Sequence, residues 1–134
     1  MIQKTIKSTL VQKLLEITPA IDTVYEAVSP PYTPIANTPY QEVNFIPAIN
    51  EEQYVNEYDY KAKGIFQVTL KYPDGVGNGA ISDRADLIVD KFRYGKNFSG
   101  VKIMNTPMVK NMGSDGVNTI YVVSINYSYF VEVL

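Results

Sequence analysis

The residues from Gly64 to Phe92 read GIFQVTLKYPDGVGNGAISDRADLIVDKF, and this stretch decides the fold. Its first part alternates apolar and polar side chains, a period of two that predicts a strand with one buried face. Pro73 and three nearby glycines then interrupt the alternation and predict a turn. After the turn, apolar residues recur at helical spacing on a single stripe: Ile81, Ala85, Ile88 and Phe92. The stretch therefore predicts a strand, a glycine-rich loop and a helix, in that order.

Regular patterns flank this stretch on both sides. Apolar residues between Ile2 and Ile17 recur at spacings of three and four, which predicts an amphipathic helix of about four turns that Pro19 ends. Prolines between Ser29 and Pro39 predict an irregular connection. Further strands are expected at 23–27, 40–46, 101–109 and 119–133, and Pro107 indicates an edge or a bulge in the third of these.

These patterns predict one domain, residues 1–134, of the α+β class. We expect a single, mostly antiparallel sheet of four or five strands with two helices packed on one face. The last strand has a half-polar second face that carries Ser124, Asn126 and Ser128. One side of the sheet is therefore expected to be exposed or shared with a neighbouring molecule.

The composition excludes several familiar chemistries. The chain has no cysteine and no histidine, so disulfides, thiolate or imidazole metal sites and Ser-His-Asp triads cannot form. No signal peptide or long apolar run is evident, which predicts a soluble protein made in the cytoplasm. The formal net charge of −2 argues against general nucleic-acid binding. We expect no catalytic residues, no metal and no cofactor.

Charge is divided unevenly along the chain. Residues 14–60 contain eight acids and no lysine or arginine, whereas residues 91–110 contain five cations and no acid. One interpretation is ordinary solvated surface, because blocks in a sequence need not become patches on a surface. The other is a subunit with an acidic and a basic side, which could meet head to tail in a closed ring.

The acidic block includes the tyrosine-rich sequence NEEQYVNEYDY at residues 50–60. It could be a mobile loop or edge hairpin, but tyrosine is enriched at interfaces and we favour a contact arm. The candidate interface residues are drawn from this segment and from the basic block: Glu51, Glu52, Tyr54, Glu57, Tyr58, Asp59, Lys91, Arg93, Lys96 and Lys102.

Two other features could suggest a ligand site. The loop PDGVGNG, residues 73–79, lies between strand and helix, but it lacks the Lys-Ser/Thr of a phosphate-binding loop, so a simple turn is favoured. Asp83, Asp86 and Asp90 could share one helix face and bind a hard cation. Because Arg84 and Lys91 are interleaved with them, a solvated helix face is the favoured interpretation.

An ordered set of short motifs carries a family resemblance. They are Thr38-Pro39-Tyr40, Gly64 with Phe66-Gln67-Val68, Tyr72-Pro73 with Gly75 and Gly77, Ala85-Asp86 with Phe92, Thr106-Pro107, and Ser124-Ile125 with Tyr127. In this order, over nearly the whole chain, the sequence resembles a family of small phage proteins similar to siphophage tail terminators.

The resemblance implies an assembly protein without catalytic residues. Such a subunit forms a hexameric ring at the head-proximal end of the virion tail, caps the tail tube, halts its polymerisation and offers a surface to the head-tail connector. The implied partners are further copies of the chain, the tail tube protein and the connector, with no specific nucleic-acid or membrane binding. The alternatives are a head-to-tail joining (neck) protein, a small nucleotide-binding module using the 73–79 loop, and an adaptor that binds a host protein through the tyrosine-rich segment.

Overall fold

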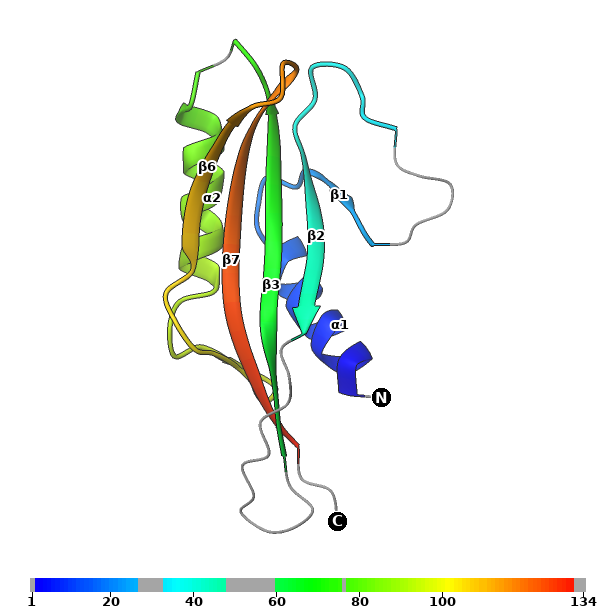
Figure 1. Ribbon diagram of the computed structural model, residues 1–134, viewed down its shortest axis with the longest axis vertical. Coiled ribbons are helices and arrows are strands. Elements are labelled where there is room, and N and C mark those ends of the chain that lie inside the picture. Colours follow the sequence, from blue (N-terminus) through cyan, green and yellow to red (C-terminus); the bar gives the residue numbers. More distant parts are fainter. Residues whose placement is uncertain (1, 27–32, 48–59, 76, 132–134) are drawn as a thin grey trace.

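The computed structural model describes residues 2–26, 33–47, 60–75 and 77–131 (Figure 1). Within these ranges the chain forms two helices and seven strands: α1 (Ile2–Leu15), β1 (Asp22–Val24), β2 (Tyr40–Pro47), β3 (Tyr60–Pro73), α2 (Gly79–Lys91), β4 (Asn97–Phe98), β5 (Val101–Ile103), β6 (Met108–Ser114) and β7 (Asn118–Val131).

The strands form one sheet in the order β1-β2-β3-β7-β5-β4, with β6 also paired to β7. Strand β3 pairs with β7 along its whole length, from Tyr60 opposite Val131 to Pro73 opposite Asn118. The free edge of β7 is therefore shared, with β6 beside its first half and β5 beside its second half. In Figure 1, β3 and β7 run through the centre, with β6 at one edge and β1 at the other.

The prediction of a sheet of four or five strands is wrong, because the described residues form a sheet of seven strands. The sheet is mixed, since β1 and β2 pair in parallel whereas the other pairs are antiparallel. Strand β4 has no counterpart among the expected strands, because its two residues are too few to show an alternating pattern. The single strand expected at 101–109 is two strands, β5 and β6, separated around Pro107. Strand β1 runs parallel to β2 because the connection between them is long enough to return the chain to the same end of the sheet.

Both helices pack on the same face of the sheet, α1 near β2 and α2 against β3 and β7 (Figure 1). Helix α1 contributes Ile6, Leu10 and Leu14 to the core, and all three are fully buried. The stripe predicted on α2 is confirmed: Ile81, Ala85, Ile88 and Phe92 are buried. Each large apolar side chain buried in this way contributes about 1.5–3 kcal/mol to folding.

Aromatic contacts join the sheet to the end of α2. The ring of Phe66, at the centre of β3, stacks on Phe45 with centroids 4.7 Å apart and meets Phe92 edge-on at 5.9 Å. Phe92 in turn meets Phe98 of β4 at 5.8 Å. Edge-to-face and offset pairs of this kind add about 0.5–1.5 kcal/mol each beyond their buried area. The row therefore holds β2, β3, α2 and β4 together.

The glycine-rich loop is a turn, as the sequence predicts. Gly75 and Gly77 have φ angles of 89° and 76°, which favour glycine because it has no Cβ. The Asp74 N–H donates to the Val117 carbonyl at 3.0 Å, so the loop is tied to the neighbouring β6–β7 turn. Its described geometry favours a chain reversal and gives no support to a nucleotide site.

Arg84 is a buried cation on α2, only 3% exposed. Its Nη1 donates a hydrogen bond to the carbonyl of Pro19, and burial lowers the pKa of its guanidinium. The contact ties α2 to the segment that follows α1. Helical periodicity could not reveal this hydrogen bond, because its acceptor lies far away in the sequence.

We predict that Gly64→Ala destabilises the protein by about 1–3 kcal/mol, because the added methyl overpacks the sheet. A Cβ there would lie 2.6 Å from the Tyr127 hydroxyl and 2.7 Å from the Ile46 carbonyl oxygen. Urea denaturation measures the loss. Adding Tyr127→Phe to the same chain should recover part of it, since the nearest clashing atom is then gone.

Gly79→Ala is the matched control, because a Cβ at Gly79 meets no atom within 4 Å. Its stability should stay within about 0.5 kcal/mol of the parent chain. Equal stabilities of the two alanine variants would contradict the close approach at Gly64.

Candidate functional site

The described parts of the chain contain no metal-binding cluster and no membrane-spanning helix. Among them, no group of three or more histidine, cysteine, aspartate or glutamate side chains is placed to hold a metal ion. No helix within the same ranges is long and apolar enough to cross a membrane.

The structure describes the four predicted cationic residues of the interface. Lys91 ends α2, Arg93 follows it, and Lys96 and Lys102 lie on the β4–β5 hairpin. The backbone brings the hairpin together, since the N–H of Ile103 donates to the Lys96 carbonyl at 2.9 Å. All four lie between the last residue of α2 and the middle of β5 in the sequence.

Two of these cations are already paired within the chain. The Lys91 ammonium donates to Glu16 at 2.8 Å, which joins the basic block to the acidic block inside one molecule. Arg93 pairs with Asp90 one helical turn earlier. Lys96 and Lys102 are exposed and form no ion pair with any other described residue, so they are the cations best placed to meet a partner.

The acidic half of the predicted interface lies outside the described residues. It comprises Glu51, Glu52, Tyr54, Glu57, Tyr58 and Asp59, all within 48–59. Their role stays a prediction.

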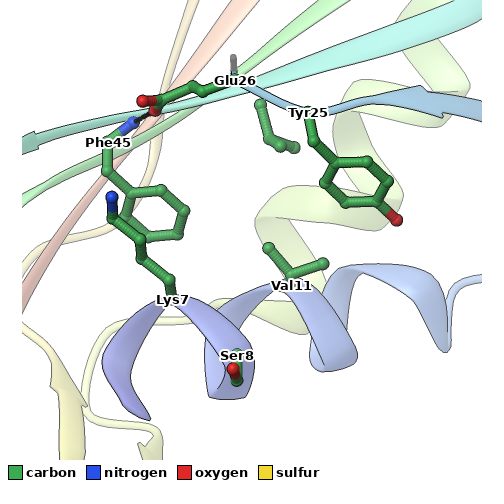
Figure 2. Close-up of a pocket in the computed structure, with 7 residues that line it drawn as sticks. Lys7, Ser8, Val11, Tyr25, Glu26 and Phe45 are labelled. Carbon is green, nitrogen blue, oxygen red and sulfur yellow. Dashed lines mark hydrogen bonds between the residues drawn. The ribbon is translucent and has the colours of Figure 1, made fainter. Parts of the chain in front are cut away.

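A groove lies where α1 crosses the end of β1 and the strand β2 (Figure 2). Its volume is about 290 Å³, and its apolar lining comes from Val11, Tyr25, Val43 and Phe45. Lys7 and Glu26 form its polar rim. The Lys7 ammonium lies 5.5 Å from the centroid of the Phe45 ring, and the Glu26 carboxylate accepts a hydrogen bond from the Phe45 N–H.

Periodicity alone did not reveal this groove. Val43 and Phe45 read as ordinary inward-facing strand residues, and Tyr25 is one of several tyrosines. The sequence predicted the strand at 40–46, which β2 confirms. It carried no information on where α1 would leave that strand uncovered.

A second hollow of about 420 Å³ lies beside the end of β2, the first part of β3 and the second half of β7. The Tyr127 ring borders it, and burial raises the pKa of the Tyr127 hydroxyl. That hydroxyl is buried without a hydrogen-bond partner among the described residues. The ring fills the space left by Gly64, so its placement is explained by packing.

Strand β6 exposes apolar side chains at an edge of the sheet. Met108 and Met112 are 71% and 53% exposed, and Val109 is 39% exposed. The strand pairs only with β7 among the described strands, which confirms the edge position that Pro107 indicated. The sequence pattern does not reveal this exposure, because Met108 and Val109 fit the pattern of an ordinary strand.

Comparison with known proteins identifies the family. The profile of the phage tail terminator protein matches residues 2–127. The chain belongs to the phage tail terminator family. The family resemblance seen in the ordered motifs is therefore confirmed, and the protein is a structural component of a phage tail.

The fold is also shared with a solved structure. That structure is 19% identical, superposes with a TM-score of 0.70 and is aligned over 99% of this chain and 96% of its own. At this identity the likeness shows the fold alone. No curated protein matches the chain.

We predict that Glu16→Gln weakens folding at neutral pH and that the difference from the parent chain disappears in acid. Hydrogen bonding from Lys91, with a further contribution from Lys13, holds the pKa of Glu16 below its ordinary value of 4.5. A depressed carboxyl pKa adds stability above the unfolded-state pKa, and this stability is lost as pH falls through the folded value. Urea denaturation at pH 7 and pH ~3 measures the change.

Asp86→Asn is the control, because Asp86 is exposed on α2 and pairs with no described cation. Its difference from the parent chain should be small at both pH values. A Glu16→Gln difference that persists unchanged in acid would exclude the ion pair as its cause.

Proposed function

We propose that this protein caps the phage tail tube as a hexameric ring, ends tube polymerisation and provides the surface to which the head is joined. The observation that carries the proposal is the match to the tail terminator family over residues 2–127. Its partners are then further copies of itself, the tail tube protein and the head-tail connector. It acts at the head-proximal end of the virion tail after synthesis in the host cytoplasm.

The asymmetry of the subunit supports this proposal. A ring that stops a polymer needs one face complementary to the tube and another that does not propagate it. Both helices cover one face of the sheet, whereas no described helix covers the other (Figure 1). The uncovered face carries half-buried polar side chains, among them Gln67, Ser124 and Asn126. Contacts between unlike surfaces close into rings when the rotation between copies fits.

The cations on the β4–β5 hairpin suggest one part of the interface. Lys96 and Lys102 are exposed, and the acid-rich residues 48–59 have the opposite charge. We propose that this complementarity, with Lys91 and Arg93 nearby, helps to orient the protein on its partners. Attraction between exposed charges weakens with added salt, so the assembly should be salt-sensitive.

A phage that lacks this protein is predicted to make tails of uncontrolled length, because nothing stops addition of tube subunits. Electron microscopy of lysates would measure the tail-length distribution, with the parent gene supplied in trans as the control. Tails of normal, uniform length in its absence would refute the terminator proposal. Normal tails that fail to join heads would favour the neck-protein alternative.

Lys96→Glu combined with Lys102→Glu is predicted to reduce assembly by about tenfold or more while the monomer stays folded. Analytical ultracentrifugation with and without tail tubes measures assembly, and circular dichroism reports folding. The Lys96→Gln, Lys102→Gln variant separates loss of positive charge from new repulsion. Its degree of assembly should lie between those of the parent chain and the glutamate variant. Undiminished assembly of the glutamate variant would remove these cations from the interface.

A further inference from the structure

The outer edge of β6 combines two properties that need a partner. Its backbone is unpaired on that side among the described strands, and its side chains at Met108 and Met112 are largely exposed. An open edge with exposed apolar side chains favours association, and proteins usually cover or charge such an edge. Here one cation, Lys110, lies between the two methionines. The edge is therefore suited to a partner with apolar and acidic groups.

The groove of α1, β1 and β2 lies at the opposite edge of the same sheet. Strand β1 ends the sheet on one side, whereas β6 is paired to the far side of β7 (Figure 1). The β6 edge and the groove of one molecule are thus separated by the full width of β2, β3 and β7. A second copy of the chain can bring them together.

The groove and the β6 edge have complementary chemistry. Phe45 and Tyr25 offer aromatic rings at the groove (Figure 2), and methionine sulfur makes favourable contacts with aromatic rings. Its volume of about 290 Å³ can accept an unbranched side chain. Glu26 at the rim is an acid, opposite in charge to Lys110. Lys7 is also at the rim, but its ammonium lies over the Phe45 ring.

We propose that the β6 edge of one copy, through Met108, Lys110 and Met112, docks in the α1–β1–β2 groove of the next copy. The two surfaces differ, so the contact is head to tail and repeats around a closed ring. The inference rests on the proposed ring and names the surfaces that join its subunits. Each copy then covers its neighbour's open edge.

Engineered cysteines test the contact directly, because the parent chain has no cysteine. Ser8 is exposed in α1 and lines the groove (Figure 2), so Ser8→Cys is a small change. Copies with Met108→Cys are mixed with copies carrying Ser8→Cys and oxidised mildly. We expect disulfide-linked dimers in the mixture. When both changes are in one chain, we expect a series of disulfide-linked oligomers that ends at the closed ring.

Copies with Asp86→Cys, on the exposed face of α2, are the control partner for Met108→Cys and should give no dimer above background. Absence of a Met108–Ser8 cross-link would overturn the contact, whether the parent chain forms rings or stays monomeric. Rings without the cross-link would leave the terminator proposal standing. Cross-linked rings of the purified protein, together with normal tails in a phage whose gene is deleted, would support the contact and refute the terminator function.

A substitution pair measures the energetic role of the edge. Met108→Ser is expected to weaken self-association by about tenfold or more, since it removes an apolar anchor. Val117→Ser is the matched control, because Val117 is equally exposed, at 71%, but lies in the turn after β6. Sedimentation equilibrium compares the two. Equal association constants for both variants would contradict the proposed role of Met108.

Discussion

The pairing of β3 with β7 is the constraint on which the rest of the structure depends. Fourteen residue pairs in one antiparallel register place Phe66 and Ile125 side by side on the inner face. Strand β2 attaches to the free edge of β3, and β5 and β6 share the free edge of β7. A register shift of one residue would turn this apolar face towards solvent and leave both helices without a surface to cover.

The helices make the two faces of this sheet chemically different, and the sheet's edges differ as well. One edge ends in β1 beside an apolar groove with an acidic rim residue, and the other exposes methionines around a lysine on β6. A subunit with unlike edges can repeat head to tail, which is the arrangement that a closed ring needs. The tail terminator family assignment and this asymmetry support the same kind of assembly.

Charge illustrates how folding changes the meaning of a sequence pattern. Acidic and basic blocks suggested two oppositely charged sides, but Glu16 and Lys91, one from each block, form an ion pair within the molecule. Glu42 of the acidic block also pairs within the molecule, with Lys71 on the neighbouring strand. The charge free to meet a partner is therefore smaller than the blocks imply. It is concentrated on side chains such as Lys96 and Lys102 that the fold leaves exposed.

The sequence by itself determined the elements whose patterns are long enough to show a period: α1, α2, β2, β3 and β7, with the buried stripe from Ile81 to Phe92. It also carried the ordered motifs of the family. Tertiary structure decided the two-residue strand β4, the division of the strand expected at 101–109 into β5 and β6, and the parallel pairing of β1 with β2, because such short segments are held by neighbours rather than by local pattern. It alone decided the groove beside Phe45 and the exposure of Met108, since both depend on which surfaces the helices and strands leave uncovered.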